Sequence, residues 1–230
     1  MYTITGKNKL NNVLHTLRAT KKSAEILDIG GTKYDLEFLN KAGFNNVLIS
    51  NNSNKELADC RKTRINFDIT KKTISKKFDV ILFMDVLEHL VEPDLAIKNI
   101  KKMLKTNGIF IITTPNLANF FNRLFLLFGW SLPNYTPSDI KTGNPLTKAK
   151  SGSSFRNSFS HKSVFTQKQL IELMQFYGFN VIIKNGYHYG ANQASEGGGN
   201  YGKIRNIFNS ILPKSMKEGI FLVLKLNEAK

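Results

Sequence analysis

The chain has 230 residues, a formal net charge of +16 and a hydrophobic share of 41%, enough apolar material for one domain with a true core. No segment approaches the roughly 20 apolar residues of a membrane-spanning helix, and residues 1–17 lack the apolar run and cleavage site of a secretory signal. A single cysteine, Cys60, excludes an internal disulfide and a multi-cysteine metal site. We therefore expect a cytoplasmic protein with no bound metal.

The predicted elements alternate between short apolar segments and helix-length segments. A short helix is expected over residues 36–43, and a second over 93–104, where Pro93 stands at the first turn. Thr166 is a suitable N-cap and Gly178 a suitable C-terminal residue for a helix between them. The predicted strands cover residues 25–30, 46–50, 63–68, 78–86, 108–116, 179–188 and 219–226.

This alternation predicts an α/β fold with a seven-stranded, mostly parallel, Rossmann-like sheet and helices on both faces. No regular crossover helix separates the last two strands, so the last strand is expected to run antiparallel. No linker divides the chain, and residues 1–230 are predicted to form a single domain. Within it we expect an N-terminal helix in 1–22, an insertion that acts as a lid over 117–165, and a mobile loop over 187–218.

The net positive charge has two interpretations. It could attract a partner that carries phosphates, either nucleic acid or an anionic membrane surface. Alternatively, lysine and asparagine are abundant along the whole chain, including in loops such as 50–57. Because no compact block of basic residues stands out, composition is the simpler explanation, and nucleic acid is not the expected partner.

Four segments are expected at the carboxyl ends of the parallel strands, where ligands bind in such sheets. They are residues 27–31 (LDIGG), Asp68, residues 84–90 (MDVLEHL) and residues 113–116 (TTPN). Glycines allow the backbone to turn tightly and to approach a ligand closely. The first segment alone would fit an ordinary structural turn, so the argument depends on the four segments together.

The segments LDIGG, FDVILFMDVLEHLVEPD and LKTNGIFIITTPN, in this order, resemble the class I methyltransferases that use S-adenosylmethionine (SAM), particularly the type 11/type 23 group. The resemblance continues through residues 117–129 (LANFFNRLFLLFG), 143–146 (GNPL) and 161–179, and covers roughly residues 22–190. It implies the Rossmann-like class I methyltransferase fold, with SAM as the cofactor.

The resemblance also implies a set of cofactor-binding positions, which are Asp28, Gly30, Gly31, Asn51, Asp68, Ile69, Met84 and Asp85. The two glycines would line the methionine end of SAM, and Asp28 would orient the loop and attract the methionine amino group. Asp68 would accept a hydrogen bond from the adenine amino group while Ile69 packs on the ring. Met84 and Asp85 would close over the cofactor.

Two positions depart from the family pattern. Thr32 and Tyr34 stand where the loop normally has its second and third glycines, and their side chains could crowd the cofactor. Asn51 stands near the end of the second strand, where an acidic residue normally binds the ribose hydroxyls. Because an amide lacks the charge-assisted hydrogen bond, SAM binding should be weaker by about 1–2 kcal/mol.

Histidines are the candidates for a catalytic base. His89 follows Glu88 near the cofactor, and its alternative role is to support the loop. His161 precedes the Thr166 helix and could face the acceptor, or could be an exposed loop residue. A general base helps when the methyl acceptor is a hydroxyl group. Tyr187 and His188 could line the same pocket or lie on the surface.

The segment 117–130 (LANFFNRLFLLFGW) is too apolar to be left uncovered. It could pack beneath the insertion as part of a lid over the acceptor. It could instead be an interfacial helix that contacts a membrane surface or a lipid-linked substrate, which would place the protein at the inner surface of the membrane. Contact between two copies in a homodimer is the third alternative.

The sequence therefore predicts a SAM-dependent methyltransferase that acts on a small-molecule, glycan or lipid-linked acceptor, at oxygen. An RNA or protein methyltransferase is the alternative that the positive charge suggests. A non-catalytic binding protein with this fold is the alternative that the missing glycines suggest.

Overall fold

The computed structural model describes residues 4–50, 63–132, 135, 143, 161–188 and 211–227. These residues form a seven-stranded sheet of order β3-β2-β1-β4-β5-β7-β6. The strands are β1 (Ile26–Ile29), β2 (Val47–Ser50), β3 (Arg64–Ile65), β4 (Phe78–Met84), β5 (Leu104–Pro115), β6 (Phe179–Tyr187) and β7 (Gly219–Leu226). Strands β1 to β5 pair in parallel, and β7 pairs antiparallel with both β5 and β6. The predicted fold class and the antiparallel last strand are confirmed.

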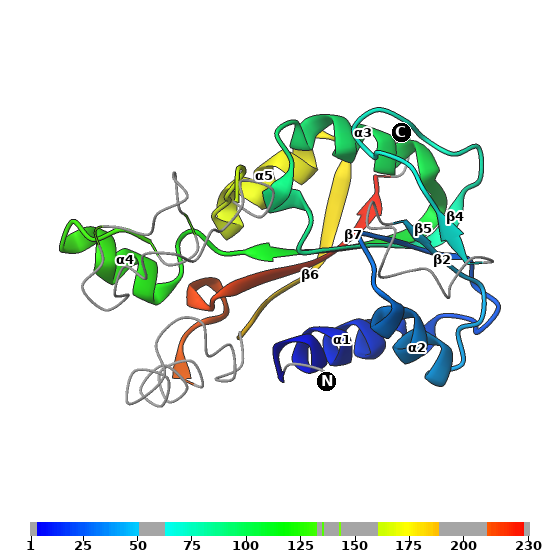
Figure 1. Cartoon of the computed structure of the whole chain (residues 1–230), viewed down its shortest axis with the longest axis horizontal. Helices are drawn as coiled ribbons and strands as arrows, with labels where there is room; N and C mark the ends of the chain where they lie inside the picture. Colours follow the sequence, from blue (N-terminus) through cyan, green and yellow to red (C-terminus); the bar gives the residue numbers. More distant parts are fainter. Residues whose placement is uncertain are drawn as a thin grey trace, which may run out of the picture.

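Helices cover both faces of the sheet (Figure 1). They are α1 (Ile4–Thr16), α2 (Lys33–Lys41), α3 (Pro93–Met103), α4 (Phe120–Leu127) and α5 (Gln167–Phe176). Helices α1 and α2 pack on one face, and α3 and α5 pack on the other. Helix α4 follows the carboxyl end of β5 and lies away from the middle of the sheet (Figure 1).

The apolar sequence of β4 explains the two layers of the core. Successive side chains of a strand point to opposite faces, so Ile81 and Phe83 pack with α3 and α5, whereas Val80 and Leu82 pack with α1 and α2. All four side chains are fully buried. At about 25 cal/mol per Å² of buried apolar surface, each stabilises the fold by roughly 1.5–3 kcal/mol.

The ends of the helices follow the predicted signals. Pro93 stands at the first turn of α3. The Thr166 hydroxyl accepts a hydrogen bond from the Gln169 amide, and the Gln169 side chain accepts one from the Thr166 amide, which is a capping box. Gly178 has φ +82° just after α5, a conformation that favours glycine.

Several boundaries differ from the sequence prediction. The strand predicted over 63–68 is only Arg64–Ile65, because β2 ends at Ser50 and β3 pairs only with its last two residues. The helix predicted over 36–43 begins earlier, at Lys33, because Thr32 caps it. Strand β5 begins at Leu104, where the helix was predicted to end, since Leu104 already pairs with Phe78.

Parts of the predicted lid and most of the loop predicted over 187–218 lie outside the described residues, as does Cys60.

Candidate cofactor and acceptor site

The turn after β1 requires glycine at two positions. Gly30 has φ +78°, its amide donates to the Ser50 carbonyl at 2.6 Å, and a Cβ there would overlap the Val86 side chain. A Cβ on Gly31 would overlap the Asp28 carboxylate. The two glycines therefore let the backbone pass close to a buried acid, at the edge of the sheet where the sequence predicts the methionine end of SAM.

Asp28 is fully buried, and neither of its carboxylate oxygens has a hydrogen-bond partner within the described part of the chain. Burial raises the pKa of this carboxyl well above its ordinary value; the nearby Asp35 charge raises it further, and Lys9 opposes the change. A buried, unsatisfied acid is costly. Its position therefore fits a ligand that brings a positively charged donor, as the methionine ammonium of SAM would.

Thr32 and Tyr34, at the positions where the sequence analysis expected the second and third motif glycines, lie at the start of α2. Thr32 is its N-cap: the Thr32 hydroxyl donates to Asp35 Oδ2 at 2.7 Å, and the Asp35 amide donates back to the Thr32 oxygen at 3.4 Å. Tyr34 is 51% exposed. Thr32 therefore caps α2, which stabilises the helix by about 1 kcal/mol, and Tyr34 lies in its first turn.

Asp68 and Ile69 lie in a turn after β3. Asp68 Oδ1 accepts hydrogen bonds from the Thr70 hydroxyl at 2.7 Å and the Thr70 amide at 3.0 Å, and these bonds lower the pKa of the carboxyl. The side chain is 41% exposed, with Lys71 3.6 Å from Oδ2. Ile69 is buried, and its carbonyl accepts a bond from Asn99 of α3 at 2.8 Å. Asp68 is therefore an ionised, fixed acceptor.

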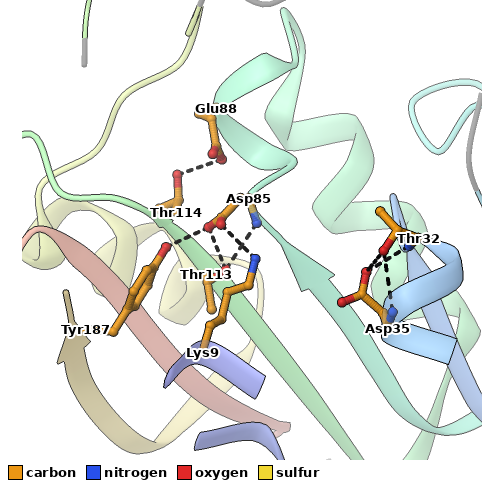
Figure 2. A network of polar contacts seen from close by, with 8 residues as sticks. All are labelled: Lys9, Thr32, Asp35, Asp85, Glu88, Thr113, Thr114 and Tyr187. Atoms are coloured by element: carbon orange, nitrogen blue, oxygen red, sulfur yellow. Dashed lines mark hydrogen bonds and ion pairs between the residues drawn. The ribbon is translucent and has the colours of Figure 1, made fainter. Parts of the chain in front are cut away.

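Asp85, just after β4, gathers contacts from three other elements (Figure 2). Its carboxylate accepts from Lys9 of α1 at 2.8 Å, from Thr113 of β5 at 2.7 Å and from Tyr187 of β6 at 2.7 Å. Its φ of +55° is positive, as for no other described residue that is not glycine, and such a conformation persists only where surrounding contacts enforce it. The sequence analysis missed Lys9, because an isolated lysine in a basic chain carries no signal.

The electrostatics of this contact favour charged partners. Burial would lower the pKa of Lys9, but the adjacent Asp85 carboxylate more than compensates and raises it. Burial likewise works against ionisation of Asp85, yet Lys9, Tyr187 and Thr113 together lower its pKa. Lys9 and Asp85 therefore form an ion pair at neutral pH.

Glu88 and His89, which follow β4, lie close to His161, which precedes α5. Their potential ligand atoms all lie within 4.8 Å of one another, and the two imidazole centroids are 5.1 Å apart. Glu88 is buried, and its carboxylate accepts from the Thr114 hydroxyl at 3.0 Å. Burial, helped by the Asp85 charge, raises the pKa of Glu88 to about 8. The two predicted catalytic histidines are thus neighbours, beside a buried acid, Glu88, that the sequence analysis did not include among the site residues.

Backbone hydrogen bonds hold the His161 segment against this turn. The Glu88 carbonyl accepts from the amides of Lys162 at 2.6 Å and Ser163 at 3.1 Å, and the Ser163 hydroxyl donates to the Leu90 carbonyl at 2.7 Å. His161 is therefore fixed near His89 although the two are far apart in sequence. A carboxylate and two imidazoles could hold a divalent metal ion, a donor set that the sequence analysis did not anticipate.

The remaining predicted residues occupy varied positions. Met84 is buried at the end of β4, on the α1 and α2 side of the sheet. Tyr187 is buried and bonded to Asp85 rather than lying on the surface, and His188 next to it is partly exposed. Asn51, the predicted ribose ligand, lies outside the described residues.

The apolar segment 117–130 divides into two sets of side chains. Phe121 and Phe125 of α4 are buried, whereas Leu126, Leu127 and Phe128 are 58%, 78% and 58% exposed. Among the helices that the structure describes, none combines the length and the apolar character needed to cross a bilayer.

The sheet order and the residues at its carboxyl edge define a class I SAM-dependent methyltransferase. The model of a methyltransferase-domain family, type 23, matches residues 5–183, and the chain belongs to this family. The predicted recognition is confirmed.

Relatives with curated functions match only locally. A ubiquinone biosynthesis O-methyltransferase of Pelagibacter ubique is 41% identical over 58 residues, 24% of each protein. The chain thus aligns with about a quarter of the length of this relative.

Solved structures support the fold over nearly the whole chain. A SAM-dependent methyltransferase from Clostridium acetobutylicum is 14% identical with a TM-score of 0.61, covering 96% of this chain and 92% of that one. Magnesium protoporphyrin IX methyltransferase from Synechocystis, with bound S-adenosylhomocysteine (SAH), is 13% identical with a TM-score of 0.59, covering 99% and 89%. Methyltransferases of this class thus bind SAM or its product.

Proposed function

We propose that this chain transfers a methyl group from SAM to an oxygen atom of a small-molecule, glycan or lipid-linked acceptor. The observation that carries the proposal is the arrangement at one sheet edge. A buried acid without a partner in the described chain, Asp28, lies beneath a glycine turn, and the acid–histidine cluster of Glu88, His89 and His161 lies on the turn after β4. The local similarity to O-methyltransferases also supports oxygen as the acceptor atom.

The residues present fit SAM. Asp28 would receive the methionine ammonium, the turn of Gly30 and Gly31 would admit its close approach, and the ionised Asp68 would accept a hydrogen bond from the adenine amino group. Bound SAM supplies an electrophilic methyl group on a sulfonium. The remaining work of the chain is to align the acceptor for an in-line displacement and to exclude water.

Methyl transfer to a hydroxyl group requires that its proton be removed. His89 and His161 are the candidate bases, because imidazole accepts a proton near neutral pH. With its pKa at about 8, Glu88 is largely protonated at neutral pH and does not compete for the proton. It would instead orient the histidines from its fixed bond to Thr114.

The experiment that tests the reaction follows SAH release from SAM with fractionated pools of hydroxylated metabolites. We expect at least one fraction to support SAH release. His161→Gln should then lower the rate of SAH release by about 10²- to 10⁴-fold, the usual contribution of a general base, and should leave SAM affinity unchanged. The exposed His15→Gln is the matched control. Unchanged turnover in both His161→Gln and His89→Gln would contradict the assigned base.

Cofactor binding has its own test. Asp68→Asn keeps an acceptor for the Thr70 turn but removes the charge, so SAM affinity should fall by about tenfold or more, measured by calorimetry. The control is Glu92→Gln, an exposed acid that makes no side-chain bond at the start of α3. Equal affinities for Asp68→Asn and wild type would show that Asp68 does not bind the adenine.

Of the three proposed kinds of acceptor, the exposed apolar side chains of α4 favour a lipid-linked one. The exposed Leu126, Leu127 and Phe128 follow β5, on the side of the sheet from which the acceptor would approach, and apolar side chains of this kind bind acyl chains or a membrane surface.

A further inference from the structure

The N-terminal helix is tied to the site by one buried side chain. Lys9 of α1 is 15% exposed, and its Nζ lies 2.8 Å from Asp85 Oδ2 across 76 residues of sequence. The charges of Asp28 and Asp35, the acids on either side of the glycine turn, also help to raise the pKa of Lys9. In Figure 2 the Lys9 side chain reaches Asp85 from α1, and Thr32 and Asp35 at the start of α2 lie to its right.

Several hydrogen bonds hold Asp85, the partner of Lys9, in one position. The Asp85 amide donates to both the carbonyl and the hydroxyl oxygen of Thr113, at 3.0 and 3.1 Å, and the Asp85 carboxylate accepts from the Thr113 and Tyr187 hydroxyls. These contacts use Oδ1 and leave Oδ2 for Lys9. A carboxylate fixed by two neighbouring strands gives the helix one defined docking position, because a buried pair tolerates little misalignment.

Among the described side chains of α1, those beyond Lys9 that face the sheet are apolar. Leu10 and Val13 of the helix, and Leu17 just after it, are buried against the face of the sheet that also holds Val80 and Leu82. Such contacts are not directional and do not by themselves fix the helix at the sheet edge. The Lys9–Asp85 pair is the polar contact that the structure gives between the described side chains of α1 and the strand ends.

We propose that Lys9 is a positioning residue that holds α1 closed beside the cofactor loop, so that its ion pair with Asp85 controls how fast SAM leaves. The proposal rests on the proposed function, because the ligand retained is SAM. While the pair is intact, α1 and the β4 turn keep one arrangement around Asp28. When the pair breaks, α1 loses this fixed contact with the turn after β4, and the described apolar contacts of Leu10, Val13 and Leu17 remain. Because SAM leaves from molecules in which this arrangement is lost, breaking the pair increases their share and so the dissociation rate.

The test measures SAM dissociation by rapid mixing with excess SAH, and hydrogen exchange of the α1 amides with and without SAM. Lys9→Met should raise the dissociation rate by about tenfold and speed exchange in α1. Lys9→Arg, which keeps the charge, should restore much of the retention. Arg18→Met is the matched control, since Arg18 is an exposed cation that follows the same helix, and both readouts should match wild type.

The outcomes separate the two proposals. A wild-type chain that binds no SAM contradicts the proposed function. A wild-type chain that binds SAM, with Lys9→Met showing the same dissociation rate and α1 exchange as Arg18→Met, overturns the role of Lys9 alone. If Lys9→Met does not fold, Lys9→Gln, which keeps an N–H donor without the charge, is measured in the same way. An unchanged dissociation rate in that variant overturns the inference.

Discussion

At the scale of single residues, the site combines side chains whose charge states depend on one another. Asp28 and Glu88 have raised pKa values because both are buried beside another acid, whereas Asp85 has a lowered one because Lys9 and two hydroxyls stabilise its charge. Divergent pKa values among neighbouring acids are typical of functional sites. They make this edge of the sheet a candidate ligand site, at a cost in stability.

Because Asp28 has a shifted pKa, it should make the free energy of unfolding depend on pH. Its folded-state pKa lies above the unfolded value of about 3.9, so the folded chain binds a proton that the unfolded chain releases. The contribution of this group to stability is therefore full below about pH 4 and is lost as the pH rises through the folded pKa. Asp28→Asn should remove this loss, so that its stability relative to wild type rises as the pH is raised from about 5 to about 8.

Urea denaturation of the SAM-free chain at about pH 5 and about pH 8 checks this expectation. Glu37→Gln, which changes an exposed acid on α2, serves as the control and should show no such trend. An Asp28→Asn variant whose stability relative to wild type is constant or falls as the pH rises would mean that Asp28 is satisfied in the folded chain.

At the scale of elements, α4 has one buried side and one exposed side. Phe121 and Phe125 are buried within the protein, whereas Leu127, at its end, is 78% exposed. If the exposed side chains contact a membrane or a lipid-linked acceptor, Leu127→Glu should reduce co-sedimentation with anionic liposomes several-fold, since a charge at the interface opposes burial.

Phe176→Glu is the matched control for this measurement. Phe176 is 82% exposed at the end of α5, so the same change is made to an apolar residue on another helix. Wild-type protein that does not co-sediment, or Leu127→Glu that co-sediments as wild type does, rules out membrane contact through α4. A wild-type dimer that Leu127→Glu dissociates, measured by sedimentation velocity, would assign the exposed side chains to contact between two copies.

How far the sequence predicted these elements depended on the range of the contacts involved. The approximate strand positions and the Thr166 N-cap of α5 follow from local patterns, namely runs of apolar residues and a threonine just before the helix. The length of β3 could not be predicted, because the end of its partner β2 limits it. The Asp85 contacts with Lys9 and Tyr187 join residues 76 and 102 positions apart, and no local sequence pattern predicts such pairs.

At the scale of the whole molecule, the TTPN segment joins the parallel and antiparallel parts of the sheet. Asn116 is buried, and its side-chain amide donates to the carbonyls of Ser215 at 2.8 Å and Lys217 at 2.9 Å. Its side-chain oxygen accepts from the Ala118 amide at 3.0 Å. A residue that the sequence analysis placed near the ligand thus fixes the start of β7 against the end of β5.

Asn116→Ala should therefore lower the free energy of unfolding by about 2–3 kcal/mol, because it leaves buried backbone groups unsatisfied. Chemical denaturation measures the change. Asn180→Ala, at an exposed position on β6, should change it by less than about 0.5 kcal/mol. Similar decreases in the free energy of unfolding in the two variants would show that the Asn116 side chain does not stabilise the contact between β5 and the segment before β7.

The central claim is that this chain binds SAM although its loop has glycines only at positions 30 and 31. We propose that Asp28, Asp68 and the turn after β4 bind the cofactor, while Thr32, at a position where the family pattern has a glycine, caps α2. The most direct test is isothermal titration calorimetry of the wild-type chain with SAM. The account predicts a saturable 1:1 heat with a dissociation constant of order 10–100 µM. No heat with SAM at about 1 mM would contradict it.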